Sequence, residues 1–313
     1  MPPVLAIVGA TATGKSALAM ALAERLSGEI VNADALQAYR GFDIGTAKPS
    51  RADRERVPHH LLDILDPHET YSAGEFARRA REAIAEIRER DGVPIVVGGS
   101  GLYQRALFAG ISPIPPGDPR VRSELRARLA HEGLDSLHAE LARLDPRTAA
   151  RLSAGDSQRV LRALEVALVS GRPLSSWIAE QPFGNQGIAA IRVGLTLPRS
   201  ILYDQISGRV ARMIAAGWKD EVAGLLRRGL SADLPAFQAI GYRQIVRHLE
   251  GEASLEQAVA EIVKDTRRFA KRQETWFRKE PDVTWFSALE DTERCIAGVL
   301  DHAKRWGPGG PDG

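Results

Sequence analysis

Apolar residues in this chain gather in short runs, separated by longer segments where they recur every three or four positions. Short apolar runs of this kind are typical of buried strands, and the recurring pattern is typical of amphipathic helices such as 73–90. Alternation of the two predicts an α/β fold, with a parallel sheet covered by helices on both faces. The strands are expected at Val4–Val8, Glu29–Ala33, Val93–Val97, Ile191–Leu197 and Val283–Phe286.

Between about Pro115 and Gln181 the pattern changes to helices without a strand. The turn-rich stretches "PIPPGDP" and "EQPFGNQG" bound this region. We therefore expect an all-helical insertion domain at 116–181, within an α/β core made of 1–115 and 182–313. The chain is expected to be helical again from Arg199 to Lys279, and its tail "WGPGGPDG" to be disordered.

Composition narrows the class of protein. A chain of 313 residues, 44% of them hydrophobic, can bury one large core and a smaller insert. A single cysteine excludes an internal disulfide framework, and no apolar run reaches the roughly 20 residues of a membrane span. We expect a cytoplasmic protein. Only seven of the 42 basic residues are lysine, and we attribute the arginine excess mainly to composition, so only the placement of charge argues for nucleic acid.

A phosphate-binding motif follows the first predicted strand. The pattern G-x-x-x-x-G-K-[ST] lets backbone N–H groups and a helix N-terminus converge on phosphate oxygens, with the lysine adding a point charge. Its last residue, Ser16, is expected to ligate Mg²⁺ through its hydroxyl. The predicted diphosphate site comprises Gly9, Ala10, Thr11, Ala12, Thr13, Gly14, Lys15 and Ser16.

An acidic residue is missing where a nucleotide hydrolase would carry one. The apolar strand "VPIVV" runs into Gly98-Gly99-Ser100 rather than into an aspartate. Asp34 instead ends the strand at 29–33, and the carboxyl edge of a parallel sheet is where ligands bind. We expect Asp34 to face the same crevice as Lys15; the alternative is a helix N-cap for Ala35–Arg40.

A series of motifs in this order resembles the tRNA dimethylallyltransferase family over roughly residues 4 to 286. The motifs are "GATATGKS", "DALQAYRGFDIGTAKP", "PHHLLDILDPHETYSAGEF", "VVGGSGLYQRAL", "DSQRVLRALEV", "AIGYRQ" and "KRQETWFR". The resemblance implies a P-loop kinase-like sheet with a helical insert. It also implies transfer of a dimethylallyl group from dimethylallyl diphosphate to the N6 amine of the adenosine 3′ of the anticodon in tRNA.

The resemblance assigns roles residue by residue. It implies Asp34 as general base for the amine, with Lys15, Ser100 and Arg122 at the reacting centre; Arg122 could instead be an exposed helix arginine. Ala10, Thr13 and Ala35 depart from the family's usual Pro, Ser and Ser, and Ala35 removes a hydroxyl beside the catalytic aspartate. The implied tRNA contacts are Asp34, Ala35, Leu36, Gln37, Gln158, Arg159, Val160, Leu161, Arg162, Gln238, Gly241, Tyr242, Arg243, Lys271 and Arg272.

The segment "EIVKDTRRFAKRQETWFRKE" predicts a helix with a cationic stripe able to follow a phosphate backbone. The stripe comprises Lys264, Arg268, Lys271, Arg272 and Lys279, unless nearby acids at 261, 265 and 274 neutralise it. On another face Ile262, Phe269 and Trp276 recur every seven positions and are predicted to be core. His59 and His60 lack partners for a zinc site and are expected to be structural.

Three other functions stay open at this point. A P-loop small-molecule kinase is opposed by the missing acid after Val97, and an isopentenyltransferase acting on free adenine nucleotides by the insert and the tRNA-like segments. An RNA-binding module without catalysis is opposed by Lys15, Ser16 and Asp34. We expect a monomer that binds a tRNA anticodon stem-loop and dimethylallyl diphosphate with Mg²⁺.

Overall fold

The computed structural model describes residues 4–153, 155–180, 187–290 and 292–304. The chain divides into two compact units, one comprising Met1–Phe108 with Ile188–Gly313 and the other Ala109–Gly187. The expected insertion, 116–181, falls within the second unit. The predicted disordered tail and most of "EQPFGNQG" lie outside the described residues. Every described helix is too short or too polar to cross a lipid bilayer.

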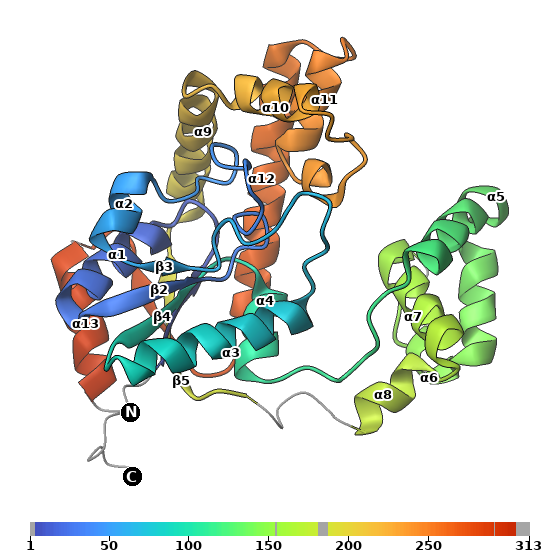
Figure 1. Cartoon of the computed structure of the whole chain (residues 1–313), viewed down its shortest axis with the longest axis horizontal. Helices are drawn as coiled ribbons and strands as arrows, with labels where there is room; N and C mark the ends of the chain where they lie inside the picture. Colours follow the sequence, from blue (N-terminus) through green and yellow to red (C-terminus); the bar gives the residue numbers. More distant parts are fainter. Residues whose placement is uncertain (1–3, 154, 181–186, 291, 305–313) are drawn as a thin grey trace. The chain divides into compact units, whose positions relative to one another are not determined.

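The first unit is built on a parallel sheet (Figure 1). Its described strands follow the order β3-β2-β4-β1-β5-β6, so β4 lies between β1 and β2. The five predicted strands are all present. Their bounds are β1 Val4–Gly9, β2 Gly28–Asn32, β4 Val93–Val97, β5 Ala190–Thr196 and β6 Val283–Ser287, and β3, His59–His60, was not predicted.

Helices cover both faces of this sheet (Figure 1). On one face, alternate strand residues such as Leu5, Ile7 and Ile95 pack against α1 and α13 in a common core. On the other face α3 contacts β2 and β4 and packs against α4. The bounds are α1 Lys15–Leu26, α3 Ala73–Glu89, α4 Gly101–Phe108 and α13 Thr292–Lys304.

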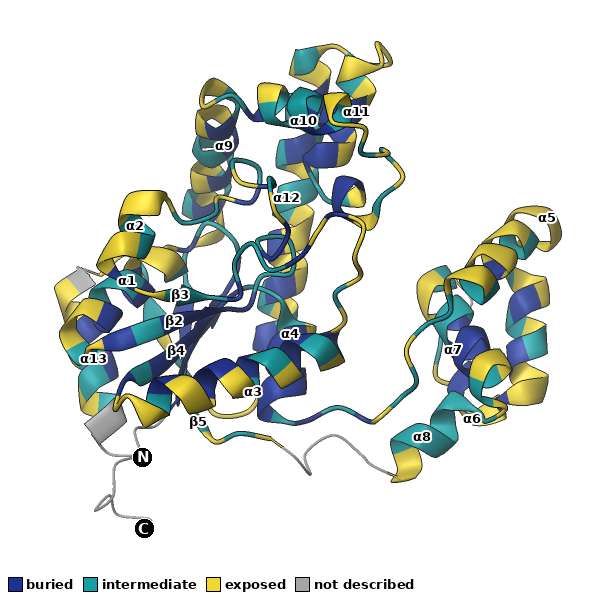
Figure 2. Cartoon of the chain, viewed as in Figure 1, coloured by how far each residue is buried: buried dark blue, intermediate teal, exposed yellow. Residues whose placement is uncertain are grey.

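A second core of the same unit lies beyond the carboxyl edge of the sheet. Its centre is aromatic: the rings of Phe42 and Tyr242 are 4.8 Å apart, those of Phe42 and Phe237 5.2 Å, and all three are fully buried. Buried residues are dark blue in Figure 2. These contacts join the loop after β2 to the C-terminal helices. The elements are α2 Arg51–Arg56, α9 Arg199–Ala215, α10 Trp218–Arg227, the 3₁₀ turn Pro235–Gln238, α11 Tyr242–Leu249 and α12 Leu255–Phe277.

The second unit is helical throughout its described residues. Leu125, Leu137 and Leu141 of one helix pack on Val160 and Leu164 of another to form a separate core. A kink at Gly133, with φ of 81°, divides the first helix into two helical segments. The helices are α5 Pro119–Leu144, α6 Pro146–Ala149, α7 Ser157–Ser170 and α8 Leu174–Glu180.

The sheet topology places three loops together. Strands β1, β2 and β4 are parallel neighbours, so their carboxyl ends meet at one edge. The loops that follow are residues 10–14, 33–50 and 98–100. Gly98 permits their close approach, because a Cβ at this position would lie 2.2 Å from the carbonyl oxygen of Ala33. Ligands of open α/β sheets bind at this edge.

Candidate active site at the carboxyl edge of the sheet

The phosphate-binding loop has the backbone that its motif requires. Gly9 has φ of +141°, and a Cβ there would lie 2.6 Å from the carbonyl oxygen of Leu195. Gly14 has φ of +87° and directly precedes α1. Thr13 is buried and its hydroxyl donates to the carbonyl oxygen of Ala10 at 2.8 Å, which closes the loop. The first turn of α1 therefore points its backbone N–H groups into the crevice.

One amide of this loop is already engaged within the protein. The N–H of Thr11 donates to Oε1 of Gln273 at 2.8 Å. Sequence reasoning assigned Thr11 to the diphosphate without this partner. The backbone donors that follow it, from Ala12 to Ser16, have no such partner among the described residues.

Lys15 is half-buried beside the loop. Its Nζ donates to the carbonyl oxygen of Ala10 at 2.5 Å. Burial and, after it, repulsion by Arg209 lower the pKa of Lys15 to about 7, while attraction to Asp34 opposes this shift. The charge of Lys15 is therefore poised to respond to an anion, since a bound phosphate restores the protonated form.

Asp34 lies just beyond β2 and is held by hydrogen bonds to Asn32 and Leu36. Its N–H donates to Oδ1 of Asn32 at 3.0 Å, and Nδ2 of Asn32 donates back to the carbonyl oxygen of Asp34 at 3.0 Å. Asp34 Oδ1 accepts from the N–H of Leu36 at 2.9 Å. Residues 35–40 form turns rather than a helix, so the N-cap alternative is wrong. The half-buried carboxylate faces a cavity.

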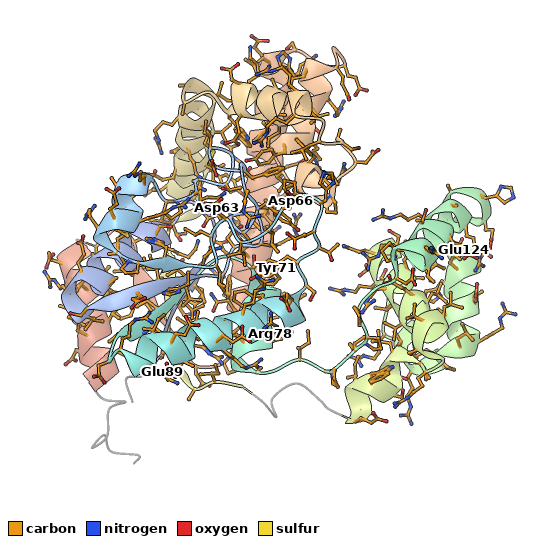
Figure 3. The ribbon with its side chains drawn as sticks, in the orientation of Figure 1. Asp63, Asp66, Tyr71, Arg78, Glu89 and Glu124 are labelled. Carbon is orange, nitrogen blue, oxygen red and sulfur yellow. The ribbon has the colours of Figure 1, made fainter. Side chains whose placement is uncertain are left out.

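The loop that carries Asp34 and Gln37 is anchored by a buried lysine. Lys48 Nζ donates to the carbonyl oxygen of Tyr39 at 2.7 Å and forms ion pairs with Asp43 at 2.6 Å and Asp63 at 2.7 Å. Asp63 is labelled in Figure 3. Its side chain is 1% exposed. Gln37 Nε2 donates to the carbonyl oxygens of residues 46 and 47 at 3.0 and 3.2 Å, which fixes its side chain.

A cavity of about 380 Å³ brings most of these groups together. Lys15, Ser16, Asp34 and Gln37 all line it, as predicted for a shared crevice. Apolar side chains one turn further along α1 and on β2 line it too. The lining includes Thr11, Lys15, Ser16, Ala19, Met20, Ile30, Asn32, Asp34, Gln37, Thr46, Lys48, Gly98, Gly99, Arg209, Phe269 and Gln273.

Arg209, Phe269 and Gln273 are among the lining residues that the sequence did not assign to the site. Arg209 of α9 is attracted by the charge of Asp34. The pKa of Arg209 is nevertheless lowered, mainly by burial. Phe269 was predicted to be core, but it is 36% exposed at the cavity, whereas Ile262 is buried as predicted. Gln273 belongs to α12. Arg209 is one arginine among many and no local motif marks it, so only the packing of α9 identifies it.

Of the other predicted catalytic residues, Ser100 does not line this cavity and Arg122 belongs to the helical unit. Ser100 follows β4 and its carbonyl oxygen accepts from the N–H of Gln104 at the start of α4, while its hydroxyl is half-buried. Arg122 belongs to the helical unit, on α5, where Nη2 lies 3.0 Å from the carboxylate of the buried Glu165. Arg122 is therefore a half-buried, ion-paired arginine of its own unit rather than a fully exposed one, and its role at the reacting centre stays a prediction.

Within the helical unit, the candidates on α7 differ in exposure. Gln158 and Arg159 are exposed, and Arg159 pairs with Asp156 at 3.3 Å. Arg162 is half-buried and donates to Glu165 at 2.7 Å. Val160 is fully buried and Leu161 is half-buried, both in the core of this unit. A direct role of the Val160 side chain in contacting RNA is therefore wrong.

The segment around α11 needs a similar correction. Tyr242 is fully buried and its hydroxyl donates to Glu221 at 2.7 Å, so its ring is not available to a base. Gly241 has φ of +95° and packs on Trp218, so a Cβ there would lie 1.9 Å from that ring. Gln238 and Arg243 are exposed, and Arg243 forms an ion pair with Asp265 at 2.5 Å.

The cationic stripe of α12 is present on the surface. Lys264, Arg268, Lys271, Arg272 and Lys279 are all exposed. Only Arg268 has an acidic partner among the described residues, Asp265 at 3.5 Å, so the acids do not neutralise the stripe. The guanidinium of Arg272 lies 5.7 Å from the ring of Phe269, which places the stripe beside the cavity.

The two histidines make ordinary structural contacts. His60 Nε2 lies 2.6 Å from Glu29, and His59 Nδ1 lies 2.7 Å from the carbonyl oxygen of Val57. Across the described part of the chain, no group of three or more His, Cys, Asp or Glu side chains could hold a metal ion. Both histidines thus make contacts within the protein, as expected for structural residues.

The chain is similar to known proteins over most of its length. Residues 37–280 match the family model described as IPP transferase. A tRNA dimethylallyltransferase of Halorhodospira halophila is 51% identical over 298 residues, covering 94% of this chain and 96% of that protein. One from Geobacter metallireducens is 50% identical over 279 residues, covering 89% and 90%.

Solved structures give the same result. The full-length tRNA isopentenylpyrophosphate transferase of Bacillus halodurans has a TM-score of 0.70 and 38% identity, covering 98% of this chain and 99% of that one. A eukaryotic dimethylallyltransferase acting on tRNA has a TM-score of 0.79 and 26% identity, covering 97% and 80%. The predicted P-loop fold and family are thereby confirmed: the chain belongs to the IPP transferase family, that of the tRNA dimethylallyltransferases.

Proposed function

We propose that this protein transfers a dimethylallyl group from dimethylallyl diphosphate to the N6 amine of the adenosine 3′ of the anticodon in tRNA, forming N6-(dimethylallyl)adenosine. One observation carries the proposal: a single cavity joins a phosphate-binding loop to the carboxylate of Asp34. Strand β4, which would be followed by an acid in a nucleotide hydrolase, is followed by Gly98 and Gly99 instead. The protein is thus a prenyltransferase of its family rather than a kinase.

The donor diphosphate fits the loop at the start of α1. Backbone N–H groups of residues 12–16 and the positive end of the helix would bind the phosphate oxygens. Lys15 and Arg209 add two positive charges beside them. Met20 and Ile30 give the same cavity an apolar wall for the dimethylallyl group. When the carbon–oxygen bond breaks, negative charge develops on the diphosphate, and these groups stabilise it.

Asp34 is the general base of the proposed reaction. As N6 of the adenine forms its bond to the dimethylallyl carbon, the amine must lose a proton, and a carboxylate beside it accepts that proton. Leu36 N–H holds Oδ1 of Asp34 at 2.9 Å. Its other oxygen makes no hydrogen bond to any described residue and is free to accept. Gln37, fixed at the same cavity, suits an adenine edge.

The residues present fit a magnesium ion shared with the substrate. Ser16 lies in the first turn of α1, exposed to the cavity, and offers a hydroxyl oxygen. The described residues hold no cluster of protein ligands, and Mg²⁺ is usually bound by few protein oxygens together with phosphates and water. When bound, the ion would neutralise diphosphate charge. Lys15 and Arg209 would act on the same oxygens.

The tRNA would be held through its phosphates and its unstacked loop. The stripe on α12 supports phosphate contact, and the exposed Arg159, Gln238 and Arg243 add polar groups in their own units. Ser100 and Arg122 are kept as proposed contributors at the reacting centre. We further propose a monomer that acts in the cytoplasm.

A transfer assay tests the proposal. Labelled dimethylallyl diphosphate and Mg²⁺ are incubated with the protein and one of three acceptors: an anticodon stem-loop with adenosine 3′ of the anticodon, the same stem-loop with guanosine there, or AMP. Label should enter only the first RNA. Label in AMP would identify an enzyme of free nucleotides, and ATP-dependent phosphorylation without any prenyl transfer would identify a kinase.

A further inference from the structure

The side chain of Gln273 joins α12 to two loops of the active site. Its Oε1 accepts from the N–H of Thr11 at 2.8 Å, and its Nε2 donates to the carbonyl oxygen of Gly99 at 2.8 Å. The residue is only 7% exposed, and it lines the cavity. Both ends of the carboxamide are therefore used inside the protein, one on the phosphate-binding loop and one on the loop after β4.

The absence of a side chain at Gly99 leaves room for this bridge. A Cβ on Gly99 would lie 2.2 Å from Nε2 of Gln273, so a side chain at position 99 would displace the carboxamide. Gln273 comes one helical turn after Phe269, on the face of α12 that lines the cavity. The bridge thus fixes how α12 meets the loops that carry Lys15 and Ser100.

Engagement of the Thr11 amide has a consequence for the loop. A backbone N–H held at 2.8 Å fixes the peptide plane that leads into residues 12–14, whose own N–H groups are the expected phosphate donors. Donors that are oriented before the anion arrives bind it without a reorganisation cost. Without the bridge, the part-buried Thr11 amide and Gly99 carbonyl would each lose a partner, which favours rearrangement of the loop.

We propose that Gln273 is a positioning residue for the diphosphate: it does not touch the reacting atoms, but it holds the phosphate-binding loop in the conformation that binds them. This inference rests on the proposed function, because it assumes that the loop binds a diphosphate. It concerns a residue of α12 whose neighbours, Lys271 and Arg272, point to solvent and belong to the cationic stripe.

The substitution Gln273→Glu tests the hydrogen-bond pattern itself. A neutral carboxylic acid can still accept from Thr11 and donate to Gly99, whereas an ionised carboxylate has no proton to donate and faces the Gly99 carbonyl oxygen. Binding of pyrophosphate with Mg²⁺ is measured by calorimetry between pH 5.5 and 8. The variant should lose affinity relative to wild type by about tenfold or more as pH rises, and recover it at low pH.

Gln273→Leu supplies the matched control. It removes both hydrogen bonds at every pH, so its pyrophosphate affinity should be low relative to wild type with a ratio that does not vary with pH. Affinity for the anticodon stem-loop should stay near the wild-type value in both variants. Equal pyrophosphate affinity of Gln273→Leu and wild type, or a constant ratio for Gln273→Glu, would overturn the proposal.

Gly99→Ala keeps the test decisive if the Gln273 variants do not fold. The added methyl group displaces the same carboxamide from the other side, so pyrophosphate affinity should again fall, and full affinity would overturn the proposal. The outcomes distinguish the proposed function from the role of Gln273. Wild-type protein that binds no pyrophosphate contradicts the proposed function as well, whereas wild-type transfer with normal binding in all variants contradicts only the role of Gln273.

Discussion

Lys15 and Arg209 place two positive charges at one cavity, although they come from α1 and α9, far apart in the sequence. Burial and repulsion by Arg209 bring the pKa of Lys15 down to about 7 from its ordinary 10.5, and Asp34 only partly offsets this. A bound diphosphate adds negative charge beside Lys15 and raises its pKa again. Binding of the diphosphate is therefore coupled to protonation of Lys15.

The pH dependence of donor binding follows from this relationship. Above about pH 7 the free enzyme loses the Lys15 proton, and the diphosphate must then bring that proton back as it binds. Affinity for pyrophosphate should therefore fall as pH rises from 7 to 9, by up to about tenfold per pH unit. Lys15→Arg keeps its charge over this range. Calorimetry on both proteins cancels the titration of pyrophosphate itself, and identical profiles would contradict the prediction.

Arg209→Ala removes the second charge. Transfer should slow by a factor of about 10² to 10³, because stabilisation of the leaving diphosphate is lost. The Lys15 pKa should rise at the same time, so that the loss of pyrophosphate affinity begins at higher pH than in wild type. Single-turnover transfer and the calorimetric pH profile give the two readouts. Arg212→Ala, one turn further on α9 and outside the cavity lining, is the control and should transfer at nearly the wild-type rate.

Arg272→Ala tests the cationic stripe. If Arg272 contacts a tRNA phosphate, the variant should bind an anticodon stem-loop more weakly, and the slope of log affinity against log salt should become shallower by about one. Pyrophosphate affinity should not change. The control is Arg294→Ala on α13, which removes an exposed arginine from a helix that packs on α1. A salt slope equal to that of wild type would return the stripe to an ordinary solvated helix face.

Gly241 and Gly251 allow strain and crowding to be separated. Both have positive φ, +95° and +81°, so alanine at either position should cost about 1 kcal/mol in backbone strain. Only Gly241 would also press a methyl group onto Trp218, which should add about 1–3 kcal/mol. Chemical denaturation measures the two free energies of unfolding. Equal losses would mean that Trp218 moves aside without cost.

Local sequence predicts the strands of this fold well and its small additions poorly. Strands β1 and β4 are buried on both faces, so they appear as continuous apolar runs whose bounds were predicted almost to the residue. Strand β3 has only two residues, both histidine, and exists because Ile30 and Val31 of β2 pair with it. Helix α13 was missed although its buried Cys295 and Ile296 complete the core against α1.

Some residues of the site were likewise predictable from the sequence and others were not. The phosphate loop and Asp34 were predictable because each follows a strand, and parallel strands end at a common edge. The place of Phe269 at the cavity could not be predicted, because its seven-residue spacing from Ile262 matches a core position. Helix α12 nevertheless presents Phe269 to the cavity. The roles of Arg209 and Gln273 depend on where whole helices pack, and no spacing in the sequence contains that information.

The most direct test of the account is single-turnover transfer by wild type and Asp34→Asn. Asparagine keeps the oxygen that accepts from Leu36 but cannot take a proton from the amine. Labelled dimethylallyl diphosphate should pass to the anticodon stem-loop at least about 10² times more slowly in the variant, with tRNA affinity near the wild-type value. Transfer at the wild-type rate by Asp34→Asn, or weak tRNA binding with normal chemistry, would contradict the assignment of Asp34 as the base.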